Sequence, residues 1–184
     1  LQIADAVSDV APKYWYAKLT KSSVTTYGWT DGLKFLDPTI DAGIGFWFRD
    51  PLGEAPNFTF SGQVVPDSPW SKTFGEATYY MLANPFPKSY DVCSESDILI
   101  SGLKETAPEL DKNGDYKKIA TQIQVPTDKS DLTTKYWYVK LTKGSTTTYG
   151  WTAGLKFETS LIVPAGRACW FKPAVASTTV QFFN

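Results

Sequence analysis

The chain has 184 residues, of which 42% are hydrophobic and 20% are charged, and its net charge is −1 at pH 7. This composition is typical of a globular protein with a sizeable core, and the balanced charge offers no basic surface to nucleic acid or to an anionic membrane. The absence of histidine excludes Ser-His-Asp and Cys-His catalysis and histidine-ligated zinc. We therefore expect no enzymatic activity, no cofactor, no nucleic-acid partner and no insertion into a membrane.

The first predicted element is a β-hairpin within residues 14–30. In "YWYAKL" the alternation places Trp15, Ala17 and Leu19 on one face, which we expect to point inward. "TKSS" then forms the turn and "TTYGWT" the returning strand. Further strands are expected in this half at 42–51 ("AGIGFWFRDP") and 57–65 ("NFTFSGQVV").

The middle of the chain, residues 66–120, reads as a mixture of loops and short strands. Its helical content is limited to a turn or two within 103–120. The strand-forming segments here and in the last third are rich in β-branched and aromatic residues, and they lie at 77–85, 97–101, 120–125, 136–141, 147–152, 165–174 and 178–183.

A long segment occurs twice. Residues 136–157 repeat residues 14–35 at an offset of 122, and the two copies differ at only four of 22 positions. "AGRACWFKPA" at 165–174 likewise repeats "AGIGFWFRDP" at an offset of 123. We therefore predict an all-β fold of two related antiparallel units, sandwich-like or barrel-like. The boundaries expected are 1–65 for a first, incomplete repeat and 66–184 for a second, fuller one.

Three kinds of short motif occur in the chain: "NPFP" at Asn84–Pro87, the Gly-Trp dipeptides at 28–29 and 150–151, and the "AGIGFWF" and "PAGRACWF" strands. In this respect the chain resembles tandem-repeat, β-rich secreted proteins of environmental and gut bacteria. The resemblance implies an exported surface or structural protein and transfers no catalytic or binding residue. The start at "LQIADAV" in place of Met also fits a processed product, and we expect an extracellular or cell-surface location.

Aromatic side chains are the first candidate functional groups. Tyrosine and tryptophan faces stack on the apolar surfaces of sugar rings, and two matched platforms would add avidity for a polysaccharide. The alternative is cross-strand packing inside the fold. Both interpretations concern the same eight residues, which are Tyr14, Tyr16, Tyr27, Trp29, Tyr136, Tyr138, Tyr149 and Trp151.

Two further features each leave alternatives open. "DKNGD" places Asp111, Asn113 and Asp115 at the spacing of a calcium loop, but Tyr116 stands where the loop requires glycine, so a simple turn competes and no metal is expected. Cys93 and Cys169 are the only cysteines. They form either a disulfide in an oxidising compartment or, at Cys169, a buried thiol in a core position.

The prediction of function rests on the two ends of the chain. Both ends are strand-like and nearly uncharged, and an incomplete first sheet would expose unpaired backbone groups. We predict a structural protein that joins copies of itself head to tail, as a filament or surface-layer subunit, by β-strand addition of a terminal segment. The residues expected in that contact are Leu1, Ile3, Val180, Phe182 and Phe183. A carbohydrate-binding module is the alternative function.

Overall fold

Antiparallel strands make up most of the regular structure in the computed structural model, which describes residues 2–3, 13–47, 69–125 and 134–184. The described strands form five open sheets, so the all-β class is confirmed. Helices α1 (Leu103–Thr106) and α2 (Tyr116–Ile119) are the helical turns expected within 103–120. Within these ranges no helix is long and apolar enough to cross a membrane.

The largest sheet has five strands in the order β12-β11-β10-β14-β7, and all neighbours are antiparallel. Its members are β7 (Tyr80–Ala83), β10 (Gln122–Gln124), β11 (Lys135–Lys143), β12 (Thr146–Thr152) and β14 (Ala168–Lys172). A second sheet has the order β6-β15-β9. It contains β6 (Trp70–Phe74), β9 (Ile98–Ile100) and β15 (Thr178–Phe182).

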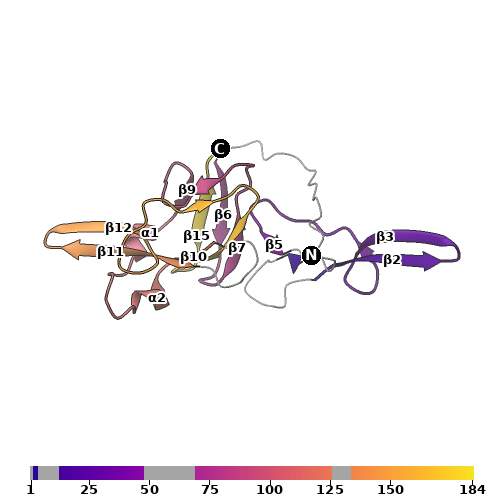
Figure 1. Ribbon diagram of the computed structural model, residues 1–184, viewed down its shortest axis with the longest axis horizontal. Helices are drawn as coiled ribbons and strands as arrows, with labels where there is room; N and C mark the ends of the chain where they lie inside the picture. Colours follow the sequence, from indigo (N-terminus) through magenta and orange to yellow (C-terminus); the bar gives the residue numbers. More distant parts are fainter. Residues whose placement is uncertain (1, 4–12, 48–68, 126–133) are drawn as a thin grey trace.

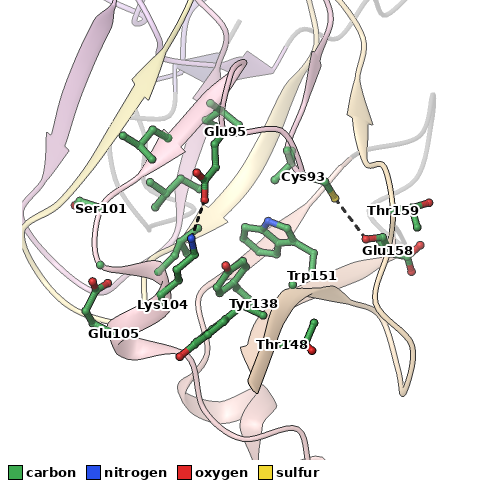
Figure 2. A pocket seen from close by; sticks show the side chains of 18 of the residues that line it. Cys93, Glu95, Ser101, Lys104, Glu105, Tyr138, Thr148, Trp151, Glu158 and Thr159 are labelled. Carbon is green, nitrogen blue, oxygen red and sulfur yellow. Dashed lines mark hydrogen bonds and ion pairs between the residues drawn. The ribbon is translucent and has the colours of Figure 1, made fainter. Parts of the chain in front are cut away.

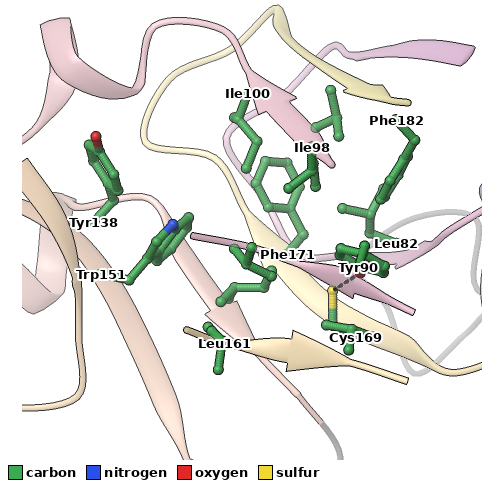
Figure 3. Close-up of a cluster of buried hydrophobic side chains, with 14 of the residues drawn as sticks. Leu82, Tyr90, Ile98, Ile100, Tyr138, Trp151, Leu161, Cys169, Phe171 and Phe182 are labelled. Atoms are coloured by element: carbon green, nitrogen blue, oxygen red, sulfur yellow. Dashed lines mark hydrogen bonds between the residues drawn. The ribbon is translucent and has the colours of Figure 1, made fainter. Parts of the chain in front are cut away.

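The core joins these two sheets (Figure 3). Buried side chains alternate with partly exposed ones along β14 and β15, as a period of two requires. Phe171 of β14 lies 5.4 Å, between ring centroids, from Phe74 of β6. The second half of the chain is therefore a two-layer, sandwich-like arrangement.

A small pair of strands closes one side of this core: β8 (Tyr90–Asp91) with β13 (Ile162–Val163). The Asp91 carboxylate accepts hydrogen bonds from the backbone N–H of Cys93 at 2.9 Å and of Leu161 at 2.8 Å, and from the Ser160 hydroxyl at 2.7 Å. Asp91 thus ties together two loops that are distant in the sequence.

The first half of the chain forms two small sheets. β1 (Gln2–Ile3) pairs with β5 (Phe46–Trp47), and β2 (Trp15–Lys21), β3 (Val24–Thr30) and β4 (Phe35–Leu36) form a ribbon. Figure 1 shows the β2–β3 hairpin projecting at one end of the long axis and the β11–β12 hairpin at the other.

Residues 43–45 connect the first half to the larger sheet. Ile44 forms a bridge with Leu82 of β7. Gly45 N–H donates to the Met81 carbonyl at 3.1 Å, and Ala83 N–H donates to the Gly43 carbonyl at 3.0 Å. The segment therefore continues the sheet beyond β7.

Most predicted strands are present in the described part of the chain. The strand expected at 57–65 lies outside the described residues, as do Leu1 and residues 48–51 of the strand expected at 42–51. β6 was not predicted, because "WSKTF" lacks a clear hydrophobic alternation.

Candidate functional site

The β2–β3 and β11–β12 hairpins, called here the first and second hairpin, pair in the same register. Trp15 lies opposite Thr30 and Trp137 lies opposite Thr152, and each further pair corresponds at the offset of 122. Tyr16 meets Trp29 edge to face at 5.4 Å, and Tyr138 meets Trp151 in the same way at 5.3 Å. Local structure follows local sequence in both copies.

The Gly-Trp dipeptide has a steric explanation. Phe35 covers Gly28 and Phe157 covers Gly150, so an added Cβ would lie 3.1 Å and 3.2 Å, respectively, from a ring atom. Phe35 pairs with Thr30 in β4, and Phe157 forms the matching bridge with Thr152. Glycine at this position leaves room for the aromatic ring.

The surroundings of the two hairpins differ. Tyr138, Val139 and Trp151 of the second hairpin are 9%, 0% and 2% exposed. In the first hairpin the exposed fraction is 64% for Tyr16 and 57% for Trp15. The prediction of one inward face was wrong for both copies: at the base of the second hairpin both faces are covered, and along most of the first hairpin both faces are exposed.

Two groups of residues cover the second hairpin. On one face Tyr138 and Trp151 join the main core (Figure 3). On the other face Trp137 lies 6.0 Å, edge to face, from Tyr116 of α2. The residues of this second cluster are Leu110, Tyr116, Ala120, Trp137, Val139 and Phe157.

The outer edge of β11 is also covered. Tyr138 N–H donates to the Thr121 carbonyl at 2.9 Å, and Lys140 N–H donates to the Pro108 carbonyl at 2.9 Å. Leu110 N–H returns a bond to the Lys140 carbonyl at 2.7 Å. Residues 108–110 therefore act as a short additional strand, whereas β2 is the edge of its sheet in the described structure.

A cleft of about 730 Å³ lies beside the second hairpin. Figure 2 shows Tyr138 and Trp151 at its centre and the Glu95–Lys104 ion pair along one side; the carboxylate and the ammonium group are 3.1 Å apart. Among the three aromatic side chains that line the cleft, Tyr149 is the most exposed. Burial, with a smaller contribution from the negative charge of Glu95, raises the pKa of Tyr138 to about 12.

The cleft residues Glu95, Lys104, Glu105 and Glu158 were not predicted from the sequence. They come from three separate segments that only the folded chain brings together. No spacing in the sequence indicates this grouping.

The eight aromatic candidates divide by burial. Tyr16, Tyr27 and Tyr149 are exposed, and Tyr14, Trp29 and Tyr136 are half-buried. Tyr138 and Trp151 are core residues and have no free face for a sugar. The structure thus lacks a matched pair of platforms, because the packing alternative holds for these two residues of the second copy.

Strand donation by the C-terminus is contradicted by the position of β15. This strand lies between β6 and β9 of its own chain, and Val180 and Phe182 are fully buried. Phe183 is half-buried, and its N–H donates to the Asp97 carbonyl at 3.1 Å. At the other end, Ile3 pairs with Phe46 in β1–β5. Removing β15 would open the core, so this strand is not available to a neighbour.

Both cysteines are free thiols, so the disulfide alternative is not realised. Cys169 is fully buried, 3.4 Å from the Tyr90 hydroxyl, as expected for a small core residue. Burial and the neighbouring Asp91 carboxylate raise the pKa of Cys93 to about 11. The Cys93 thiol donates a weak hydrogen bond to the Glu158 carbonyl, with 3.9 Å between sulfur and oxygen.

The "DKNGD" segment forms a turn. Asp111 accepts hydrogen bonds from the backbone N–H groups of Gly114, Asp115 and Tyr116 at 2.6, 3.2 and 3.2 Å. Asp115 pairs with Lys118. The carboxylates of Asp111 and Asp115 thus contact groups of the chain itself. No group of three metal-ligating side chains occurs in the part of the chain that the structure describes.

No family model, curated protein or solved structure matches this chain.

Proposed function

We propose that this protein is an extracellular structural protein that assembles by docking its first hairpin onto another polypeptide. The observation that supports this is the contrast between twin residues: Tyr16 is 64% exposed, whereas Tyr138 is 9% exposed. Several large apolar side chains exposed on one hairpin favour an interaction site. The second hairpin has nearly the same sequence, and other segments of the polypeptide cover it.

The ring geometry favours a protein partner over a flat sugar platform. Tyr16 and Trp29 meet at an interplanar angle of 69°, so they do not present one continuous aromatic plane. Trp15 and Leu19 are exposed on the opposite face. A partner that buries both faces must wrap the ribbon, as α2 and the core wrap the second hairpin.

The twin tyrosines test the proposal. Replacing Tyr138 by Ala should cost about 3–5 kcal/mol of unfolding free energy, as for other buried aromatic side chains. The matched Tyr16→Ala change should cost at most about 1 kcal/mol in the isolated chain. Urea unfolding measures both values.

Sedimentation velocity on the native extracellular assembly completes the test. Tyr16→Ala should dissociate the assembly while the released chain remains folded. If Tyr16→Ala destabilises the isolated chain as much as Tyr138→Ala, the first hairpin is already covered and the proposal is wrong. Dissociation into subunits of one kind would identify the partner as a second copy of this chain.

Carbohydrate binding is a second candidate function, and the cleft is the observation that favours it. Tyr149 is exposed there beside Glu95, Lys104 and Glu105, and an aromatic face with nearby polar groups suits a sugar. Tyr149→Ala should abolish retention on an insoluble polysaccharide. Tyr27→Ala, the twin position in the first hairpin, is the control and should leave retention unchanged. Absence of retention across a broad glycan panel would contradict this function.

A further inference from the structure

The outer edge of the second hairpin uses three backbone donors. Tyr138 and Lys140 N–H donate to the carbonyls of Thr121 and Pro108. Thr142 N–H donates to Glu109 Oε1 at 2.6 Å, and the Thr142 hydroxyl donates to Glu109 Oε2 at 3.2 Å. A carboxylate next to a short parallel strand thus completes this edge.

The first hairpin presents the same three donors. Because its pairing register is the same, the N–H groups of Tyr16, Lys18 and Thr20 point away from β3. Among the described residues no strand lies along this side of β2. An open edge of this kind is a template for a further strand.

We propose that the edge of β2 binds an extended acidic-apolar peptide segment of the Pro-Glu-Leu type, in the way that β11 binds residues 108–110. This inference rests on the proposed docking function and names the chemistry of the partner. The segment's glutamate would accept from Thr20, and its backbone would pair with Lys18.

Charge and shape support this choice of occupant. Lys18 and Lys21 lie exposed on β2, so the edge attracts an acidic segment over a basic one. Leu110 packs in the cluster of Trp137, Val139 and Phe157. Their twins are Trp15, Ala17 and Phe35, and the first of these is 57% exposed. A leucine after the glutamate would cover Trp15.

A second copy of this chain is not the expected source of the segment in its folded state. Residues 108–110 of each copy already pair with Lys140. Exchanging them would expose one hairpin in order to cover another, with no net gain in buried surface. The partner must therefore carry a free segment of this type.

A fusion variant of the full chain tests the inference at high effective concentration. At the offset of 122, residue 123 corresponds to residue 1, so a second copy of residues 103–122 is placed directly before Leu1. This reproduces the spacing between the 108–110 segment and its hairpin.

Amide hydrogen exchange is the measurement. At Tyr16, Lys18 and Thr20 the fusion should slow exchange by at least about tenfold, as new backbone hydrogen bonds form. Exchange in β11 should not change, which serves as the internal control for folding. The matched control carries Glu109→Ala and Leu110→Ser in the appended copy only, and it should lose most of the protection.

The outcomes separate the two proposals. Unchanged exchange in the fusion, with Tyr16→Ala still dissociating the native assembly, would overturn strand addition and leave docking in place. Equal protection by the altered appended copy would show that the acidic-apolar pattern is not recognised. A Tyr16→Ala variant as unstable as Tyr138→Ala would remove both proposals.

Discussion

Tyr16 and Tyr138 have the same local structure and different environments. Each meets the tryptophan of the opposite strand edge to face, at interplanar angles of 69° and 72°. The Tyr138 ring is removed from water by the core, whereas Tyr16 is not. Aromatic pairing within a hairpin is worth little beside complete desolvation, so the energetic role of each tyrosine is decided outside its own hairpin.

The pKa of Tyr138 gives a pH-dependent prediction at this scale. Its folded-state pKa of about 12 lies above the ordinary value of about 10, so its contribution to stability is complete below pH 10. That contribution should be lost as the pH rises from 10 to 12, because ionisation then favours the unfolded chain.

Tyr138→Phe should reduce this alkaline loss of unfolding free energy, measured by urea unfolding between pH 8 and pH 12. Part of the loss should remain, since burial also raises the pKa of Tyr90, beside Cys169. An identical pH profile for the Phe variant and the parent chain would contradict the assignment to Tyr138.

At the scale of the element, the hairpin is a unit that forms in two settings. Its two-residue turn places Ser22 and Ser23 at φ values of 48° and 65°, and the second copy has Gly144 at 59° in the position of Ser22. Only glycine adopts this conformation without cost. The first hairpin therefore has the less favourable turn as well as the less covered strands.

A two-stranded ribbon is marginally stable in water when nothing packs against it. β10, α2 and residues 108–110 supply this support to the second hairpin. Helix α2 and residues 108–110 belong to the segment 66–120, which has no counterpart before the first copy, whereas residues 123–125 correspond to residues 1–3 at the offset of 122. The stability of each hairpin therefore depends on what packs against it. The two hairpin sequences are nearly the same, although packing segments such as α2 precede only the second one.

For the whole molecule, the contact between residues 43–45 and β7 joins the two halves. Gly45 lies so close to the larger sheet that a Cβ would be 2.2 Å from Met81 Cγ and 2.5 Å from Ala168 Cβ. Such distances require the segment to move away from the sheet. Extending the sheet at this edge thus depends on the absence of a side chain at position 45.

Gly45→Ala should lower the unfolding free energy by about 1–3 kcal/mol, the usual cost of overpacking. Gly75 is the matched control, because a Cβ there has no heavy atom within 4 Å, and Gly75→Ala should have little effect. Urea unfolding compares the two. Equal stability of both variants would show that the contact between the halves does not contribute.

Several features were predictable because they depend on neighbours in the sequence. Alternation of apolar residues, turn residues and β-branched composition act over a few positions. They indicated the all-β class and both hairpins, and the duplicated motif implied the same pairing in each copy. The buried thiol alternative for Cys169 followed from its place in a core strand.

Other features depend on contacts between segments far apart in the chain, and no local pattern encodes them. The cleft combines residues near 95 and 104 with others near 150 and 158. From its sequence, β15 was predicted to pair with a neighbouring molecule. It lies between β6 and β9 of its own chain because Val180 and Phe182, on one face of the strand, fill the core. The two hairpins show the limit most clearly: their sequences are nearly identical, and only packing against residues 108–125 and the core makes Tyr138 a buried residue while Tyr16 remains at the surface.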